Sequence, residues 1–364
     1  MHKTSAWPLA LIYAGLIVYA SLYPFADWRY QGIVPWSFLD APFPKYWTAF
    51  DLGANVAGYV PLGFFLALSA LRTGRSRHAL ALAMLAAATL SLVMESLQSY
   101  LPARVPSNVD LALNILGAWG GALAAWALER LGVLDRWSRF RARWFIAEAR
   151  GALVLLAMWP LALLFPAAVP FGLGQVLERL EAALAGALVD TPFLDWLPVR
   201  DIEWQPLVPG VALVCVLLGL LIPCLLGFCI IRSVGRRVVF LLAVFGLGIG
   251  FTALSAALSY GPEHAWTWFG VPVKAGLVVA FGLAAALLWL PRRASAALAL
   301  LSLGLYLSLL NQVPTSPYFA QTLSTWEQGR FIRFHGLAQW LGWVWPYAAL
   351  VYVLSQVWGR EPKN

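Results

Sequence analysis

Apolar runs of about twenty residues recur along the chain of 364 residues, separated by short polar segments. A run of that length is what an α-helix needs to cross the hydrocarbon core of a bilayer. The pattern predicts ten spans, at approximately residues 7–25, 53–71, 79–101, 109–128, 151–170, 207–231, 237–258, 272–290, 294–311 and 336–356. The sequence therefore predicts an all-α fold, a polytopic transmembrane helical bundle.

The charged residues add an orientation to this bundle. The formal net charge is +8, but most of the 25 basic residues stand in short blocks between apolar runs. These blocks occupy alternate loops, and most of the acidic residues occupy the other loops. Because cytoplasmic loops carry an excess of Lys and Arg, both termini are expected in the cytoplasm. Because membrane orientation explains the basic residues, nucleic acid is not expected as a partner.

The basic blocks also suggest how the chain is divided. Residues 1–128 are expected to form a four-span domain, in which the first run is a retained span and not a cleaved signal. Residues 129–150 read as a basic amphipathic cytoplasmic linker that rests on anionic lipid. Residues 151–364 are expected to form a six-span membrane domain with two extracytoplasmic loops, 171–206 and 311–335. Aromatic and charged residues mix in these loops, which suits either an interfacial helix or contact with a sugar or phosphate.

Polar residues enter the apolar runs in a regular pattern around the turn between the third and fourth spans. Ser91, Glu95 and Gln98 fall at i, i+4 and i+7, so they share one helix face. Glu95 lies seven residues before Pro102, roughly 10 Å below the expected helix end. A carboxylate at that depth must be protonated, hydrogen-bonded or paired. It is either a ligand or proton site, or a member of an inter-helix network that fixes packing.

The fourth span carries polar and small residues on one face. Asp110, Asn114, Gly117 and Gly121 lie at i, i+4, i+7 and i+11. Ser107 and Asp110 fit a helix capping box, which is sufficient to explain Asp110. Asn114 is one turn deeper, where no cap is needed, and it should form a hydrogen bond to the second or third span. The two glycines are expected to let a neighbouring helix approach closely.

The second span contributes further polar and helix-perturbing residues. Asn55 stands near its start, at the same membrane side as the turn after Glu95 under the expected orientation. Pro61 removes a backbone donor and should kink the helix, with Gly63 beside it. Pro61 and Gly63, together with Gly117 and Gly121, are therefore assigned to helix packing.

No sequence motif for nucleotide, zinc-protease or serine-nucleophile chemistry is present. The four histidines are scattered, so no metal site and no cofactor are expected. Cys215, Cys224 and Cys229 lie in one apolar run and read as small core residues.

The ordered set N-x5-P-L-G, E-x2-Q, a turn with Arg, and D-x3-N-x2-G-x3-G resembles the VanZ-like family of membrane proteins. The matching residues are Asn55, Pro61, Leu62, Gly63, Glu95, Gln98, Arg104, Asp110, Asn114, Gly117 and Gly121. The resemblance covers about residues 7–128. Founding members of that family are associated with resistance to the glycopeptide antibiotic teicoplanin. It implies a multi-pass protein of the bacterial cytoplasmic (inner) membrane with a part in cell-envelope function.

Three functions are consistent with these residues. The first is binding of an envelope component, without catalysis, at an outward-facing site made of Asn55, Glu95, Gln98, Arg104, Asp110 and Asn114. The second is an enzyme that acts on a lipid-linked saccharide or phospholipid from outside, with Glu95 or Asp110 as acid or base and Arg104 on a phosphate. The third is a transporter, which would need polar residues along a path to both sides. Expected partners are membrane lipids and a lipid-linked glycan or peptidoglycan precursor.

Overall fold

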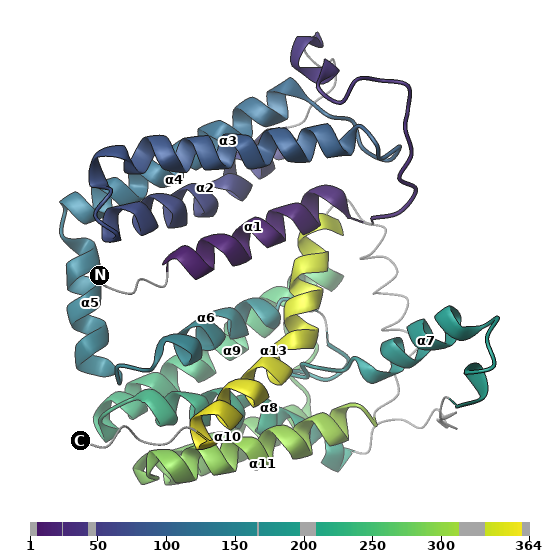
Figure 1. Cartoon of the computed structure of the whole chain (residues 1–364). Helices are drawn as coiled ribbons and strands as arrows, with labels where there is room; N and C mark the ends of the chain where they lie inside the picture. Colours follow the sequence, from purple (N-terminus) through teal and green to yellow (C-terminus); the bar gives the residue numbers. More distant parts are fainter. Residues whose placement is uncertain are drawn as a thin grey trace. The chain divides into compact units, whose positions relative to one another are not determined.

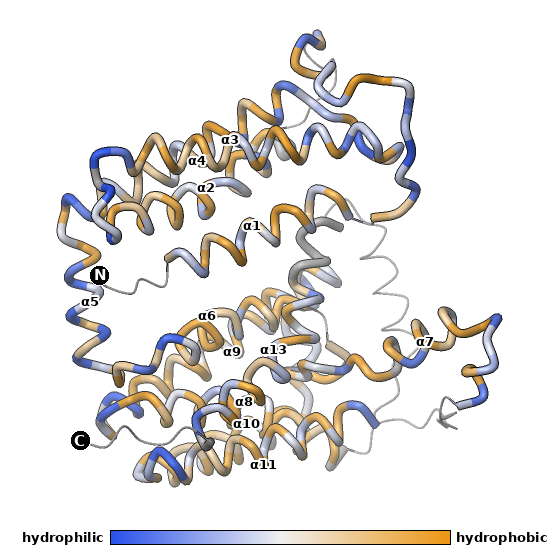
Figure 2. Tube along the Cα trace, viewed as in Figure 1, coloured by the Kyte–Doolittle hydropathy of each residue, from blue (hydrophilic) through white to orange (hydrophobic). Residues whose placement is uncertain are grey.

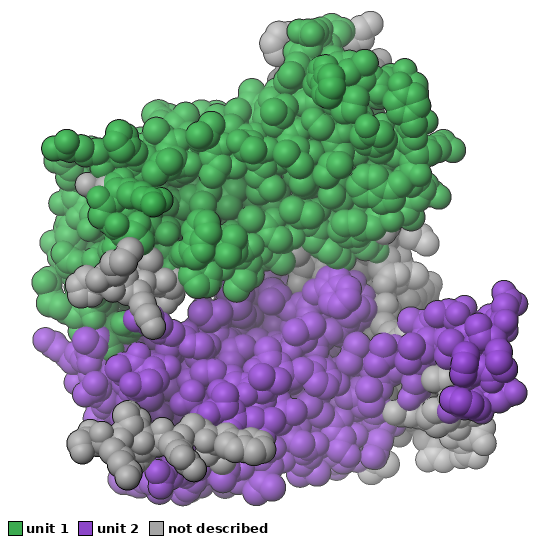
Figure 3. Space-filling model, viewed as in Figure 1, with its two compact units in different colours: residues 1–141 green, residues 142–364 purple. Residues whose placement is uncertain are grey.

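The computed structural model describes residues 6–23, 25–42, 49–165, 167–196, 209–312 and 332–358. Across these ranges the regular elements are helices, and the one β interaction is an isolated bridge between Phe145 and Ile231. The predicted all-α class is therefore confirmed for the described part of the chain. The chain separates into two compact units, residues 1–141 and 142–364, which are coloured separately in Figure 3.

The first unit is built from four apolar helices and most of a short polar one, whose last three residues belong to the second unit (Figure 1). The helices are α1 (Ala6–Leu22), α2 (Ala49–Arg72), α3 (Ala79–Gln98), α4 (Asn108–Arg130) and α5 (Val133–Trp144), with 3-10 turns η1 (Ser37–Asp40) and η2 (Ser76–His78). α1 and α4 both pack against α2, and α3 packs against all three. A small apolar core forms where they meet, and it includes Ile17, Tyr59, Leu62, Met94 and Ala118.

Close approach of α2 and α4 depends on three glycines. A Cβ at Gly63 would lie 1.9 Å from the carbonyl oxygen of Ala118, and one at Gly121 would lie 1.9 Å from that of Val60. At Gly117 the corresponding distance, to the carbonyl oxygen of Val56, would be 2.2 Å. No side chain fits at such distances, so backbone packs directly on backbone along this interface. Pro61 lies inside α2, which continues as one helix to Arg72.

α5 lies within residues 129–150, the segment for which the sequence predicts a basic amphipathic linker. It begins after α4 ends at Arg130, and none of its residues is buried. Figure 2 shows hydrophilic residues along it, in contrast to the mainly hydrophobic long helices. Trp137 and Phe140 stack on one another while both stay exposed.

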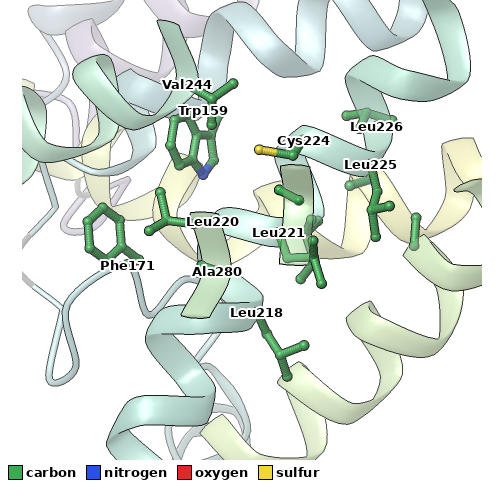
Figure 4. Packing of buried hydrophobic residues seen from close by; sticks show 14 of the residues in the cluster. Trp159, Phe171, Leu218, Leu220, Leu221, Cys224, Leu225, Leu226, Val244 and Ala280 are labelled. Atoms are coloured by element: carbon green, nitrogen blue, oxygen red, sulfur yellow. The ribbon is translucent and has the colours of Figure 1, made fainter. Parts of the chain in front are cut away.

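The second unit is a larger helical assembly around α8. Its elements are α6 (Arg150–Ala162), α7 (Leu177–Leu188), η3 (Leu194–Trp196), α8 (Pro209–Ile230), α9 (Val234–Tyr260), η4 (Pro262–His264), α10 (Val271–Ala286), η5 (Leu287–Trp289), α11 (Arg292–Leu310) and α13 (Ile332–Trp358). α8 contacts α6, α9, α10 and α11. Trp159 of α6, Leu220 of α8 and Val244 of α9 meet in the core, beside Phe171 (Figure 4). Cys215, Cys224 and Cys229 are all buried and free, as the sequence predicts.

Seven of the described helices are long and apolar enough to cross a membrane: α2, α3, α4, α8, α9, α10 continued by η5, and α11. α1 and α6 are apolar but shorter. The protein is therefore a multi-pass membrane protein of the helical class. The count of ten spans and the cytoplasmic position of both termini stay predictions.

The fifth predicted span, residues 151–170, differs most from its helix. α6 ends at Ala162, and tighter turns follow, in which Leu164 and Phe165 donate to carbonyls three residues back. Helices usually end before the residue that precedes a proline, and the sequence has Pro166 at this point. Of the two predicted loops, 197–206 and 313–331 lie outside the described residues.

Candidate functional site

The predicted polar residues of the first unit gather around the α3–α4 turn. Glu95, on the last turns of α3, is only 4% exposed, and its Oε2 accepts a hydrogen bond of 2.9 Å from the backbone N–H of Ser107. Ser107 is the N-cap of α4, and its Oγ accepts from the N–H groups of Val109 and Asp110. The predicted N-cap is thus present. In a capping box the backbone N–H of Ser107 would donate to the side chain of Asp110, but here it donates to Glu95 on the neighbouring helix. A buried carboxylate gains from this position because a helix N-terminus carries partial positive charge.

Asp110 is paired across the α2–α4 interface. Its Oδ1 accepts from Asn55 Nδ2 at 2.6 Å, and both side chains are half-buried. Both residues lie near the starts of their helices. The pair therefore sits at the same end of the bundle as the Glu95–Ser107 bond.

Asn114 lies one turn below Asp110 and is buried. Its Nδ2 donates to Ser91 Oγ at 2.9 Å, which links α4 to α3 as the sequence predicts. Its Oδ1 has no hydrogen-bond partner among the described residues. The same holds for the hydroxyl of Tyr59 on α2, which lies close to Ser91 and Glu95 without a hydrogen bond of normal geometry to either. Two buried polar atoms without partners in one cluster are a costly arrangement unless something else binds them.

Gln98 and Arg104 serve a different element, the C-terminal end of α1. Gln98 Nε2 donates to the carbonyl of Ser21 at 3.1 Å. Arg104 Nη2 donates to the carbonyls of Ala20 and Tyr23, at 3.4 and 2.7 Å. The last carbonyls of a helix have no partner within the helix and carry partial negative charge, so a guanidinium there is favourable. Arg104 thus fastens α1 to the α3–α4 turn.

The loop between α1 and α2 packs over this same end. The N–H of Arg29 donates to the carbonyl of Tyr100 at 2.9 Å, and Gln31 Nε2 donates to that of Ser99 at 2.7 Å. Asn108 Nδ2 donates to the carbonyl of Ala41 at 2.8 Å. We call residues 25–42 the covering loop.

The covering loop carries exposed aromatic side chains. Trp28, Tyr30 and Trp36 are all exposed, the first held by a bond from its Nε1 to the carbonyl of Phe25. Aromatic rings with a polar atom suit both a membrane interface and contact with a saccharide face.

Comparison with known proteins found a family match over the helices that hold this cluster. The model of the VanZ/LLP1 family matches residues 7–129, the range that runs from α1 to the end of α4. The N-terminal third of the chain is a VanZ/LLP1 domain. The polar cluster and the glycine-mediated α2–α4 interface both belong to this domain. No curated protein matched the chain, and no solved structure matched it.

The sequence pattern predicted most residues of this polar cluster, but it did not predict Tyr59 or the covering loop. Tyr59 follows Asn55 by four residues, so its place on the same face of α2 could have been inferred. The covering loop gave a weaker signal, a concentration of aromatic residues between two apolar runs. The six predicted ligand residues lie in two groups: Asn55, Glu95, Asp110 and Asn114 bond across α2, α3 and α4, and Gln98 and Arg104 bond to α1.

Proposed function

We propose that the VanZ/LLP1 domain binds the polar part of a cell-envelope component at the Asn55, Tyr59, Glu95, Asp110 and Asn114 cluster. The observation that carries the proposal is the pair of buried, unpartnered polar atoms, Asn114 Oδ1 and the Tyr59 hydroxyl. Buried polar groups in native proteins nearly always have partners, and a bound ligand would supply them. A ligand hydroxyl or amide N–H is the donor that Asn114 Oδ1 requires.

The proposed ligand is a lipid-linked glycan or peptidoglycan precursor, because such a molecule matches both parts of the site. Its sugar or peptide would supply hydroxyl and amide groups to the cluster, and the exposed aromatic rings of the covering loop would contact sugar faces. Its lipid chain would stay in the bilayer beside the apolar helices. The charge bias of the sequence favours the extracytoplasmic side, where such precursors are used.

Entry of this ligand would begin at the half-buried Asn55–Asp110 pair and end one turn deeper at Asn114. The covering loop is held to the α3–α4 turn by the three hydrogen bonds described above, so its release would widen access. Binding without chemistry is favoured because Glu95 and Asp110 each hold a structural hydrogen bond. Resistance to teicoplanin-type antibiotics would then follow from an altered supply or display of the bound precursor.

The experiment measures how tightly the full chain in lipid nanodiscs binds a purified polyprenyl-diphosphate-linked muropeptide, and it compares the wild type with single variants. Intrinsic tryptophan fluorescence is the signal. Asn114→Leu removes the unpartnered acceptor while it keeps the branched shape of the side chain, and it should weaken binding about tenfold, the effect of one buried hydrogen bond. Ser91→Ala removes the same internal bond but leaves Asn114 Oδ1 in place, so it should bind more tightly than Asn114→Leu. Thr89→Val, an exposed position on α3, is the matched control and should equal the wild type.

Equal binding by Asn114→Leu and Thr89→Val would overturn the proposal. Conversion of the precursor to a product by the wild type, lost in Glu95→Gln, would replace binding with the enzymatic alternative. Cells that express the same variants supply a second readout, because teicoplanin susceptibility should follow precursor affinity.

A further inference from the structure

The second unit collects arginines at one end, where three segments meet. Phe145 and Ile231 form the isolated β-bridge, and Ile146 donates its N–H to the carbonyl of Ile230 at 3.0 Å. This pairing places the segment before α6 against the link between α8 and α9. Arg143 is near the end of α5, just before this segment, Arg232 lies in the link, and Arg236 lies in the first turn of α9.

The side chains of Arg232 and Arg236 are held in place by backbone. Arg232 Nε donates to the carbonyl of Phe145 at 2.9 Å, and Arg236 Nη1 donates to the carbonyl of Arg143. The guanidinium of Arg236 also lies over the ring of Trp144, 5.7 Å from its centroid. The positive-inside rule requires only that a cytoplasmic loop carry positive charge. It does not require the guanidinium groups of Arg232 and Arg236 to be held in fixed positions, as they are here.

The fixed guanidinium groups keep unused donors. Arginine has several N–H donors, and each of these two uses one of them for the backbone. No carboxylate pairs with Arg143, Arg232 or Arg236 within the described ranges. The first turn of α9 adds positive potential, because it has no side-chain cap and no acidic residue.

A buried neighbour links this cluster to the α10–α11 turn. Arg237 is 6% exposed and donates from Nη1 to the carbonyls of Leu288 and Leu290, both at 2.7 Å. Its Nη2 donates to the carbonyl of Phe228 at 2.8 Å, at the end of α8. Trp289, on the same turn as these acceptors, is 71% exposed. The arginines therefore lie beside an outward-facing tryptophan at the ends of membrane-length helices.

We infer that this end of the second unit binds the phosphate headgroup of an anionic phospholipid. Arginine donors recognise phosphate oxygens in a fork geometry, and basic pockets at the ends of spanning helices suit such headgroups. Trp144 and Trp289 are of the type that lies at headgroup level, which favours a lipid over a soluble anion. The chemistry is that of a phosphate diester, held by Arg143, Arg232 and Arg236.

The test is native mass spectrometry of the full chain from micelles doped with phosphatidylglycerol, cardiolipin or phosphatidylcholine. The wild type should retain the two anionic lipids and not phosphatidylcholine. Arg232→Gln combined with Arg236→Gln should bind the anionic lipids about 30-fold more weakly, from a factor of about five for each arginine near a headgroup. Arg75→Gln combined with Arg77→Gln removes equal charge from an exposed turn of the first unit and is the matched control.

A single variant keeps the test informative if the double variant unfolds. Arg143→Gln leaves both backbone-anchored arginines intact, because only the carbonyl of Arg143 accepts a bond. It should weaken retention about fivefold at an unchanged thermal midpoint. The inference is overturned if Arg143→Gln retains lipid as the control does, if phosphatidylcholine is retained equally, or if inorganic phosphate binds as tightly as phosphatidylglycerol.

Discussion

The α2–α4 interface gives the sharpest stability prediction, because one helix carries both a test position and its control. Gly121→Ala places a Cβ 1.9 Å from the carbonyl oxygen of Val60. Ordinary contact begins at 3.4 Å, so α2 and α4 must separate by roughly 1.5 Å. Gly120→Ala, one residue earlier, meets nothing within 4 Å.

Both replacements gain the same helix propensity, about 0.5–1 kcal/mol in favour of alanine. The difference between them therefore isolates the steric clash, which should cost about 1–3 kcal/mol as overpacking does elsewhere. Gly120→Ala should equal or slightly exceed the wild type in stability, and Gly121→Ala should fall below both. The expected shift also loosens the Asn55–Asp110 bond, which spans the same two helices.

The assay is unfolding of the purified full chain in mixed micelles by added SDS, followed by circular dichroism. A lower midpoint for Gly121→Ala than for Gly120→Ala is the expected result. If the two variants unfold together, direct backbone contact at this interface is wrong. A lower midpoint for Gly120→Ala would contradict the open space that the structure shows beside Gly120.

Three further predictions concern single polar contacts. Arg104→Ala should destabilise the first unit by about 1–2 kcal/mol, through loss of charged donors at the end of α1, and should raise the proteolysis rate of the covering loop. Asp110→Asn keeps an acceptor for Asn55 and should preserve the SDS midpoint, whereas Asp110→Ala should lower the midpoint through a loss of about 1 kcal/mol in the free energy of unfolding; equal midpoints for the two variants would exclude a structural role for that bond. Arg237→Met should destabilise the second unit by about 3 kcal/mol, because three carbonyls lose a charged donor, and a thermal midpoint equal to that of Arg75→Met would contradict this.

Helical periodicity predicted much of this fold because the constraints are local. A bilayer requires apolar runs of one length, and the positions of α2, α3, α4, α8, α9 and α11 follow from it within a few residues. α6 is shorter than its apolar run because the chain turns after Ala162, which depends on packing and on a following proline.

The candidate site was only partly predictable because its contacts join segments distant in sequence. Nearness to the predicted turn placed Glu95, Asp110 and Asn114 at one end of the bundle, and the i, i+4 spacing of Asp110 and Asn114 anticipated a bond from Asn114 to a neighbouring span. The spacing could not show that Glu95 would accept the hydrogen bond from the backbone N–H of Ser107. In an ordinary capping box Asp110 would accept that bond, and the sequence pattern is the same in both cases. The attachment of Arg104 to α1 depends on the path of the turn, which no periodicity records.

The most direct test of the central proposal is the affinity ratio between Asn114→Leu and Thr89→Val for the lipid-linked muropeptide in nanodiscs. Asn114→Leu should bind the muropeptide about tenfold more weakly than Thr89→Val, because a ligand donor loses the buried acceptor. A ratio of one, with both variants folded, would contradict the proposal that this cluster is a binding site.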